Sequence, residues 1–256
     1  MTETMPVVFV GHGSPMNAIE DNEYSRGWRA LAAALPRPRG IVCISAHWET
    51  RGLGVTAMER PRTIYDFYGF PDELYARTYP APGDPALAQE VRRLIKSGDA
   101  QLDLSWGLDH GTWSVLCQMY PQADIPVLQL SLDRNRDAAY HYRVGQELAA
   151  LREQGILILG SGNIVHNLRL IQWREMAYDW AVEFDQQAAD WITAGDHAAL
   201  VAYEKAGRAA DLSINSAEHY LPLLYVLGAG GTARKVSFVN ERVSMGSMSM
   251  RCVVLS

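Results

Sequence analysis

The sequence predicts an α/β fold with a mixed, mainly parallel central sheet and helices on both of its faces. Short apolar runs alternate along the chain with longer segments of helical periodicity. The runs Val7–Val10, Gly40–Ser45 and Ile156–Ser161 are almost entirely apolar, which is typical of strands buried on both faces. Strands of this kind that alternate with helices form a sheet covered by helices on both sides.

The remaining elements follow from periodicity and from residues that begin or end helices. Asp84 and Pro85 suit the cap and first position of a helix, and Pro36 ends the helix before it. We expect helices over Glu23–Leu35, Ala86–Ser97, Thr112–Tyr120, Ala138–Gln154, Trp173–Thr193 and Ala198–Ala206, and one beginning at Glu218. Further strands are expected over Arg51–Ala57, Val127–Ser131, Val236–Val239 and Met250–Leu255. Because no linker, repeat or low-complexity segment interrupts the pattern, we expect one domain over residues 1–256.

Composition excludes several classes of protein. The net charge of −6 and the pI near 5.6 give no basic patch, so we expect no nucleic-acid partner. Met1–Pro6 lacks a signal-peptide pattern, and no apolar run approaches the ~18 residues of a membrane span. Cys43, Cys117 and Cys252 are an odd number in apolar surroundings, so we expect buried free thiols in a cytoplasmic protein.

Three of the seven histidines stand just after predicted buried strands. They are His12, His47 and His166. The carboxyl ends of parallel strands meet at one edge, which is where open α/β sheets bind ligands. Imidazole is the commonest metal ligand at neutral pH because its neutral form offers a lone pair. The sequence therefore predicts a metal site at the carboxyl ends of the strands.

The other four histidines divide into two kinds. His110 lies in an Asp-His-Gly turn, and His219 opens an apolar helix behind a possible Ser216 cap. Each of these two, taken alone, also suits a hydrogen-bonded core histidine. His141 lies on a charged helix and His197 in a polar turn, so we expect both on the solvent-exposed surface.

Other common motifs are incomplete. Gly11-x-Gly13 lacks the third glycine of a dinucleotide fingerprint, because position 16 is Met16. No phosphate-binding Walker loop, nucleophile elbow or His-Glu-x-x-His pair occurs. Ser14 and Ser161 lie near histidines, which leaves a serine nucleophile open, but we expect both to cap turns.

Several short motifs combine glycine, aromatic and histidine residues in one order. They are Gly11-His12-Gly13-Ser14-Pro15, Ser45-Ala46-His47-Trp48, Tyr65-Asp66-Phe67-Tyr68-Gly69-Phe70-Pro71, Asp109-His110-Gly111, Gly160-Ser161-Gly162 with His166-Asn167, and Glu218-His219. Each is weakly specific alone. In this order, from residue 7 to about 230, they resemble the class III extradiol ring-cleavage dioxygenases, and most closely the 4,5-DOPA extradiol dioxygenase type.

This resemblance implies an enzyme that opens the ring of a DOPA-like catechol with O2 and a non-haem Fe(II), giving a semialdehyde. His12 and His47 look like two histidine ligands of the metal. The wider class uses a glutamate as the third ligand. That place looks filled by His219 here, with the neighbouring Glu218 as the alternative.

The resemblance also suggests roles around the metal. His166 is similar to the acid–base histidine of the family, and His110 to one that contacts substrate or oxygen. Three histidines also make a good zinc site, so Zn(II) is expected in some preparations, with His166 as a possible fourth ligand. The aromatic stretch suggests a pocket wall or lid, with Tyr65 and Phe67 as substrate-binding residues.

Two other functions stay open at this point. A zinc-dependent hydrolase would use the same ligands, and a Memo-like protein would bind metal without catalysis. The expected partners of an enzyme are a catechol-type small molecule and O2, with no obligate second subunit. Arg51, Arg62 and Arg77 are each a candidate for a substrate carboxylate or an ordinary surface arginine.

Overall fold

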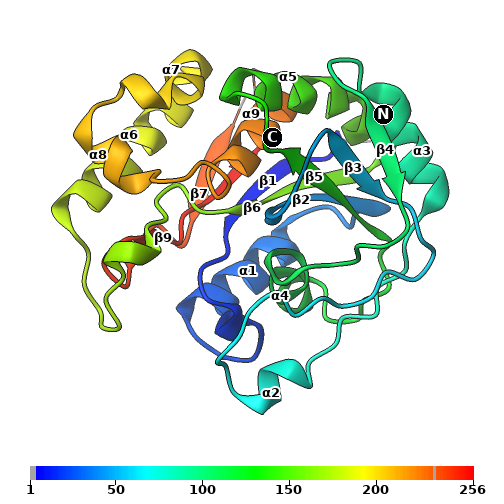
Figure 1. Cartoon of the computed structure of the whole chain (residues 1–256), viewed down its shortest axis with the longest axis horizontal. Coiled ribbons are helices and arrows are strands. Elements are labelled where there is room, and N and C mark those ends of the chain that lie inside the picture. The colour runs from blue at the N-terminus through cyan, green and yellow to red at the C-terminus, as the bar shows by residue number, and fades with distance from the viewer. Residues whose placement is uncertain (1–3, 233–234) are drawn as a thin grey trace.

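The computed structural model describes residues 4–232 and 235–256. Its centre is an eight-stranded sheet in the order β4-β3-β5-β2-β6-β1-β10-β7 (Figure 1). The strands are β1 (Val7–Gly11), β2 (Gly40–Thr50), β3 (Leu53–Thr56), β4 (Ala100–Asp103), β5 (Val127–Asp133), β6 (Ile156–Gly162), β7 (Val236–Val239) and β10 (Cys252–Leu255). The central strands β5, β2, β6 and β1 are parallel, while β10 runs antiparallel to β1 and β7. The predicted mixed, mainly parallel sheet is confirmed.

Helices cover both faces of this sheet, as predicted. One face carries α5 (Ala138–Leu148) and α9 (Leu221–Gly230), and the other carries α1 (Glu23–Ala34) and α4 (His110–Met119) (Figure 1). Strand β1 shows how the sheet separates the two cores. Val7 and Phe9 pack into the first core, and Val8 and Val10 pack into the second, because successive side chains point to opposite faces.

The other elements surround this framework. They are the helices α2 (Asp72–Tyr75), α3 (Pro85–Leu94), α6 (Asp179–Ala194), α7 (His197–Val201) and α8 (Arg208–Ser213), the 3-10 helices η1 (Pro15–Ala18), η2 (Ala149–Gln154), η3 (Leu168–Leu170) and η4 (Tyr203–Lys205), and the paired strands β8 (Val243–Ser244) and β9 (Met248–Ser249). Asp84 caps α3 by accepting from the backbone of Ala86 and Leu87, as predicted.

Helix α6 begins later than the sequence predicted. The prediction placed its start at Trp173, whereas the helix starts at Asp179. In the preceding segment, the backbone N–H groups of Gln172 and Tyr178 donate to the carbonyls of Met245 and Gly246. A tertiary contact therefore replaces the first helical turns. The predicted helix Ala198–Ala206 is likewise divided, into α7 and η4.

Strand β2 is longer than predicted and carries His47 within it. The prediction ended this strand at Ser45, whereas it continues to Thr50. Its pairing with β5 shifts register between Ile44 and Glu49, a bulge or irregularity that includes His47. Bulges re-aim side chains and often adjoin functional sites.

The prediction that His141 is solvent-exposed is wrong. Its side chain is buried between α5 and α9, where Nδ1 lies 3.0 Å from the Tyr225 hydroxyl. A Cβ at Gly145 would collide with the backbone of Tyr225, so this glycine lets the two helices approach closely enough to bury the imidazole. His197 is also more enclosed than expected, since it is partly buried beside the Tyr142 hydroxyl.

Two further expectations can be compared with the structure. Cys43, Cys117 and Cys252 are buried free thiols, as predicted. Among residues 4–232 and 235–256, no helix is both long enough and apolar enough to cross a bilayer.

Replacing His141 by glutamine is expected to remove part of the pH dependence of stability. Burial lowers the pKa of His141 from ~6.5 to about 4. Between these two pH values His141 is therefore protonated in the unfolded chain and neutral in the folded protein. Urea unfolding measures the free energy of unfolding of the wild type and of His141→Gln. The wild-type value minus the variant value should therefore fall by about 2 kcal/mol between pH 7 and pH 5.

The matched control is His197→Gln. Because His197 is only partly buried, the difference in free energy of unfolding between the wild type and His197→Gln should change less over the same pH range. A difference in free energy of unfolding between the wild type and His141→Gln that stays constant from pH 7 to pH 5 would contradict this account.

Candidate metal centre

Five histidines line one cavity of about 740 Å³ at the carboxyl edge of the sheet. His12 follows β1, His47 lies in the last part of β2, and His166 follows β6. His110 is the first residue of α4, and His219 lies two residues before α9. The strand-end histidines therefore meet in one cavity, as predicted. His110 and His219, which the sequence alone also allowed as core histidines, line the same cavity.

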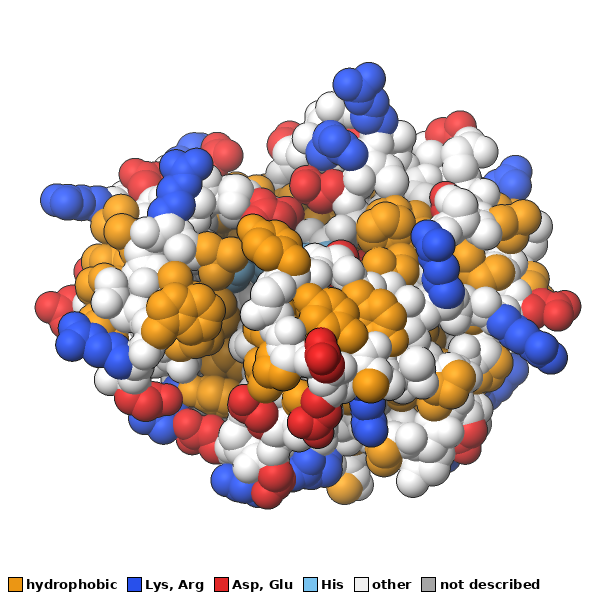
Figure 2. Space-filling model, turned by 60° about the horizontal axis from the view of Figure 1, so that its bottom comes forward, with side chains coloured by type: hydrophobic (Ala, Val, Ile, Leu, Met, Phe, Trp, Pro, Cys, Tyr) orange, Lys and Arg blue, Asp and Glu red, His pale blue; other side chains and the backbone are white. Residues whose placement is uncertain are grey.

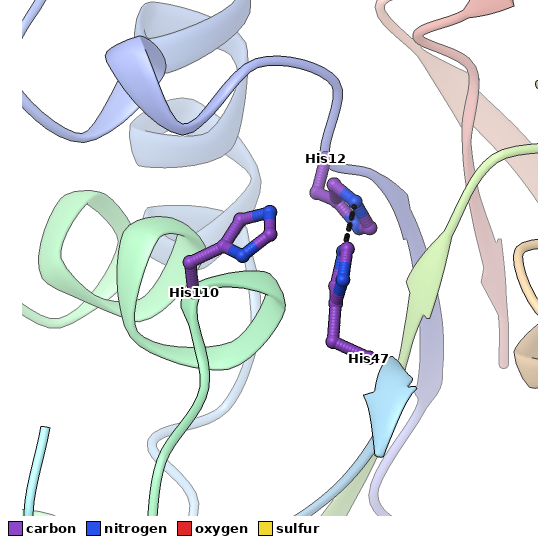
Figure 3. Close-up of side chains that lie close together, drawn as sticks. All are labelled: His12, His47 and His110. Atoms are coloured by element: carbon purple, nitrogen blue, oxygen red, sulfur yellow. Dashed lines mark hydrogen bonds between the residues drawn. The ribbon is translucent and has the colours of Figure 1, made fainter. Parts of the chain in front are cut away.

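The imidazole rings are close to one another. The ring centroids of His12, His47 and His219 form a nearly equilateral triangle with sides of 5.0, 5.0 and 5.3 Å. The ring of His110 lies 3.9 Å from that of His47, and the ring of His166 stacks on His219 at 3.4 Å. Figure 3 shows His12, His47 and His110 reaching toward a common point from a loop, a strand and a helix.

The hydrogen bonds of His12 define its tautomer. Ser161 Oγ donates to the carbonyl of Gly111, and the same oxygen lies 3.0 Å from His12 Nδ1. Since a serine hydroxyl has only one proton, His12 Nδ1 must be the donor to Ser161. The lone pair of His12 is therefore on Nε2, which faces the cavity.

A single carboxylate stands behind two further histidines. Asp66 Oδ2 lies 3.0 Å from His110 Nδ1 and 3.5 Å from His47 Nδ1. Asp66 Oδ2 and His110 Nδ1 are close, but their geometry is not that of a hydrogen bond. Asp66 also accepts from the backbone N–H of His110 at 2.9 Å. A carboxylate at Nδ1 favours a proton on that nitrogen and leaves Nε2 as the free donor of a lone pair.

His219 follows the same rule, and its neighbour Glu218 supplies the partner. His219 Nδ1 lies 3.0 Å from Glu218 Oε1, which also accepts from the Ser216 hydroxyl. The carboxylate is thus engaged with the far side of the ring, and His219 Nε2 remains free. This arrangement favours His219 over Glu218 as a ligand, in the alternative that the sequence left open.

The spacing of nitrogen atoms fits a bound metal ion. His12 Nε2 and His47 Nε2 lie 3.1 Å apart. Two nitrogens bound to one ion at ~2.0–2.1 Å lie roughly 2.8–3.4 Å apart for bond angles between square and tetrahedral. In Figure 3 this contact is a hydrogen bond in which one Nε2 carries the proton, and with both nitrogens deprotonated the same spacing suits a cation between them. The donor set therefore fits the metal that the sequence predicted.

Two separate groups of residues each have ligand atoms close enough together for an ion. The ligand atoms of His12, His47 and His110 lie within 4.8 Å of one another, and so do those of His166, Glu218 and His219. The predicted set of His12, His47 and His219 takes members from both groups and stays a prediction.

Burial keeps these imidazoles neutral. It lowers the pKa of His47 to about 3 and the pKa of His12 and His219 well below the usual value, and neighbouring histidines add to the effect. Burial also lowers the pKa of His166 to about 4. At pH 7 the four rings are therefore in the form that binds metal ions.

Glycines in the motifs let the chain segments of the site approach one another. A Cβ at Gly162 would collide with the carbonyl of His219, which accepts a hydrogen bond from the backbone N–H of Asn163. A Cβ at Gly111 would lie 2.9 Å from His47 Cδ2. Both positions need glycine because the histidine-bearing segments pack directly against them.

The walls of the cavity are apolar. Phe67 lines the cavity, whereas Tyr65 packs behind Phe67 and Trp113, with its hydroxyl donating to the Arg77 carbonyl. The other large apolar lining residues are Tyr68, Phe70, Leu168, Ile171, Trp173, Met245 and Met248. Figure 2 shows the hollow in the surface, with hydrophobic side chains on both sides and histidine atoms inside it.

The two serines differ in role. Ser14 caps η1 by accepting from the backbone of Met16, as predicted. Ser161 does not cap a turn, and that prediction is wrong, because β6 places its hydroxyl beside His12. Sequence reasoning also assigned no role to Asp66, although its position inside the aromatic motif was a usable signal.

Replacing Ser161 by alanine is expected to weaken metal binding by about 10–100-fold, because His12 Nδ1 loses its partner. The measurement is competition between the metal-depleted protein and a chromogenic chelator for Zn(II). Ser114→Ala is the matched control, since Ser114 Oγ is buried on α4 without a partner among the described residues. Equal affinity in both variants would contradict the orienting role of Ser161.

Comparison with known proteins agrees with the geometry. Residues 6–255 match the family model described as the catalytic LigB subunit of aromatic ring-opening dioxygenase. A 4,5-DOPA dioxygenase extradiol of Escherichia coli K12 is 50% identical over 255 residues, covering 97% of this chain and 94% of that protein. A protein of the same name from Beta vulgaris is 37% identical over 249 residues, covering 94% and 92%.

The fold has a solved relative as well. An uncharacterized protein from Escherichia coli K12 superposes with a TM-score of 0.84 at 45% identity, over 98% of this chain and 100% of that one. Since the family model spans nearly the whole chain and the relatives are similar over more than nine tenths of their length, the chain belongs to the LigB family of aromatic ring-opening dioxygenases.

Proposed function

We propose that this protein is an extradiol dioxygenase that opens the ring of a DOPA-like catechol. The observation that carries the proposal is the pair of Nε2 atoms of His12 and His47, 3.1 Å apart in an apolar cavity of a LigB-family chain. The names of the relatives in Escherichia coli and Beta vulgaris support DOPA as the type of substrate.

The proposed ligands are His12, His47 and His219, with His166 as a possible fourth. A divalent metal held there would bind the catechol oxygens and O2, and would lower the pKa of the bound hydroxyl groups. We propose Fe(II) as the active metal and Zn(II) as an occupant of purified protein, since three histidines suit both ions. The carboxylates of Asp66 and Glu218 offset part of the metal charge from behind the rings.

His166 is the proposed acid–base residue. Its lowered pKa leaves the imidazole neutral at pH 7, so the ring can accept the proton of a catechol hydroxyl and return it later. The ring is positioned by its stack on His219 and by a backbone hydrogen bond from His166 to the Ser213 carbonyl. These contacts hold it at the cavity beside the proposed metal ligands.

His110 and the aromatic wall are proposed to orient substrate and oxygen. His110, with Asp66 3.0 Å from its Nδ1, is proposed to contact the substrate or oxygen through Nε2. Phe67 stands next to His110, with ring centroids 5.5 Å apart in an edge-on arrangement. The catechol ring would pack against this aromatic surface.

We further propose that residues 1–256 act as one catalytic domain in the cytoplasm. The site draws on histidines from residue 12 to residue 219, a span that covers most of the chain. Three buried free thiols suit a reducing compartment.

Replacing His166 by alanine is expected to lower the rate of ring cleavage about 10²–10⁴-fold, because the proton acceptor is lost. The rate is measured from the yellow semialdehyde product, and bound metal is measured by elemental analysis. Retained metal together with lost activity is the expected result. A near-normal rate of semialdehyde formation would contradict the acid–base role.

Metal replacement tests the proposed chemistry itself. Metal-depleted protein is given Fe(II) with ascorbate, or Zn(II), and oxygen uptake with DOPA is followed in an oxygen electrode. Fe(II) is expected to restore uptake and semialdehyde formation, while Zn(II) does not. Turnover restored only by Zn(II), or Zn(II)-dependent ester cleavage without oxygen uptake, would contradict the proposal in favour of a hydrolase.

A further inference from the structure

Two large aromatic side chains are exposed at the histidine cavity. Among the phenylalanine, tyrosine and tryptophan residues that the structure describes, only Tyr68 and Trp173 are exposed, at 93% and 79%. Both line the cavity that holds the five histidines, and so does the exposed side chain of Leu168. Apolar side chains that are exposed together at the opening of a cavity mark a place where a ligand binds.

The backbone places Tyr68 at the tip of its segment. Gly69 follows it with a φ of 77°, a left-handed conformation that favours glycine. A Cβ at Gly69 would meet no described atom within 4 Å, so this turn projects outward. The preceding residue Phe67 packs against the rings of Tyr75 and His110. The segment is thus held through Phe67, while the ring of Tyr68 remains available to a ligand.

Tertiary contacts place Trp173 at the same cavity. Its neighbour Gln172 donates its backbone N–H to the carbonyl of Met245 at 2.8 Å, and its Nε2 to the Tyr178 hydroxyl at 3.0 Å. Met245 itself lines the cavity. Helix α6 begins only at Asp179, so Trp173 belongs to the cavity lining and not to the helix that the sequence predicted. The late start of α6 therefore brings an aromatic ring to the site.

The two rings stand where the ring substituent of a bound catechol would lie. In the proposed function the catechol hydroxyl groups face the histidines, so a substituent on the opposite side of the ring points toward the opening of the cavity. The histidines form the enclosed part of the lining, and Tyr68, Leu168 and Trp173 form its exposed part. Figure 2 shows hydrophobic side chains on both sides of this hollow.

The arginines that the sequence singled out lie elsewhere. Arg51, Arg62 and Arg77 are exposed, and none of them belongs to the cavity lining. The Nε of Arg62 donates instead to the carbonyl of Trp106. The exposed part of the lining therefore offers a substituent aromatic rings, which pack against carbon chains and attract ammonium groups.

We infer that Tyr68 and Trp173 hold the ring substituent of the catechol and so make the site prefer substituted catechols over catechol itself. The inference rests on the proposed ring-cleavage function and adds two specificity-determining residues to it. DOPA suits both rings, because its substituent carries a carbon chain and an ammonium group.

Alanine substitutions test the two rings by comparing DOPA with unsubstituted catechol. With the Fe(II)-loaded protein, Tyr68→Ala and Trp173→Ala should each raise KM for DOPA about fivefold, and the double variant should raise it further. Most of the effect should fall on KM and not on kcat, because the rings contact the substituent and not the reacting atoms. Catechol is added as a competitor of DOPA cleavage, which gives its inhibition constant whether or not it is itself cleaved. That constant should change by less than about twofold, because catechol has no substituent to contact the rings.

Conservative variants and a distant control separate this contact from a general loss of structure. Tyr68→Phe and Trp173→Phe keep an aromatic ring and should leave KM for DOPA within about threefold of the wild-type value. Leu104 is 73% exposed outside the cavity lining, so Leu104→Ala should change neither constant. An unchanged KM for DOPA in the double alanine variant, or an equal loss of affinity for DOPA and catechol, would overturn the inference and leave the proposed function standing. Failure of the wild type itself to cleave DOPA would overturn both.

Trp173 also provides a measurement that does not depend on turnover. It is the only exposed tryptophan among the residues that the structure describes, so it should dominate the fluorescence that acrylamide quenches. In Fe(II)-loaded protein kept free of oxygen, saturating DOPA should protect this fluorescence from acrylamide more than saturating catechol does. Equal quenching with DOPA and with catechol would contradict a contact between the substituent and Trp173.

Discussion

The partner group at Nδ1 of each proposed ligand is the constraint on which the site depends. An imidazole binds metal well only when one nitrogen is unprotonated and aimed, and the partner of the other nitrogen decides both properties. Ser161 fixes His12, Asp66 stands behind His47 and Glu218 fixes His219. Three different groups thus stand at the Nδ1 atoms, where each favours an Nε2 lone pair that faces one cavity.

The register of the sheet brings His12 and its partner Ser161 together. Ser161 is 149 residues from His12 in sequence, and the parallel pairing of β1 with β6 sets Val10 against Ser161. Glycine at position 162 then lets the segment that carries His219 lie against the end of β6. The same edge is therefore both the end of the central strands and the place where their histidines meet, which is why ligands bind there in open α/β sheets.

The sequence was sufficient to predict the sheet, the two helical layers and the meeting of the strand-end histidines, because buried parallel strands leave continuous apolar runs. It was insufficient where distant contacts decide. The sequence predicted a surface position for His141, because the packing of α9 onto α5 that buries its side chain is a contact between distant segments. The start of α6 is set by hydrogen bonds to the turn at Met245 and Gly246. The role of Asp66 depends on a loop of low periodicity, so only three-dimensional proximity reveals it.

A crystal structure of the Fe(II)-loaded protein, with anomalous diffraction at the iron edge, tests the central claim most directly. The account predicts one anomalous peak at bonding distance from the Nε2 atoms of His12, His47 and His219, with Ser161 and Glu218 still on the Nδ1 atoms. A metal bound through Nδ1, a metal ligated by Glu218 in place of His219, or no peak in the cavity would contradict it.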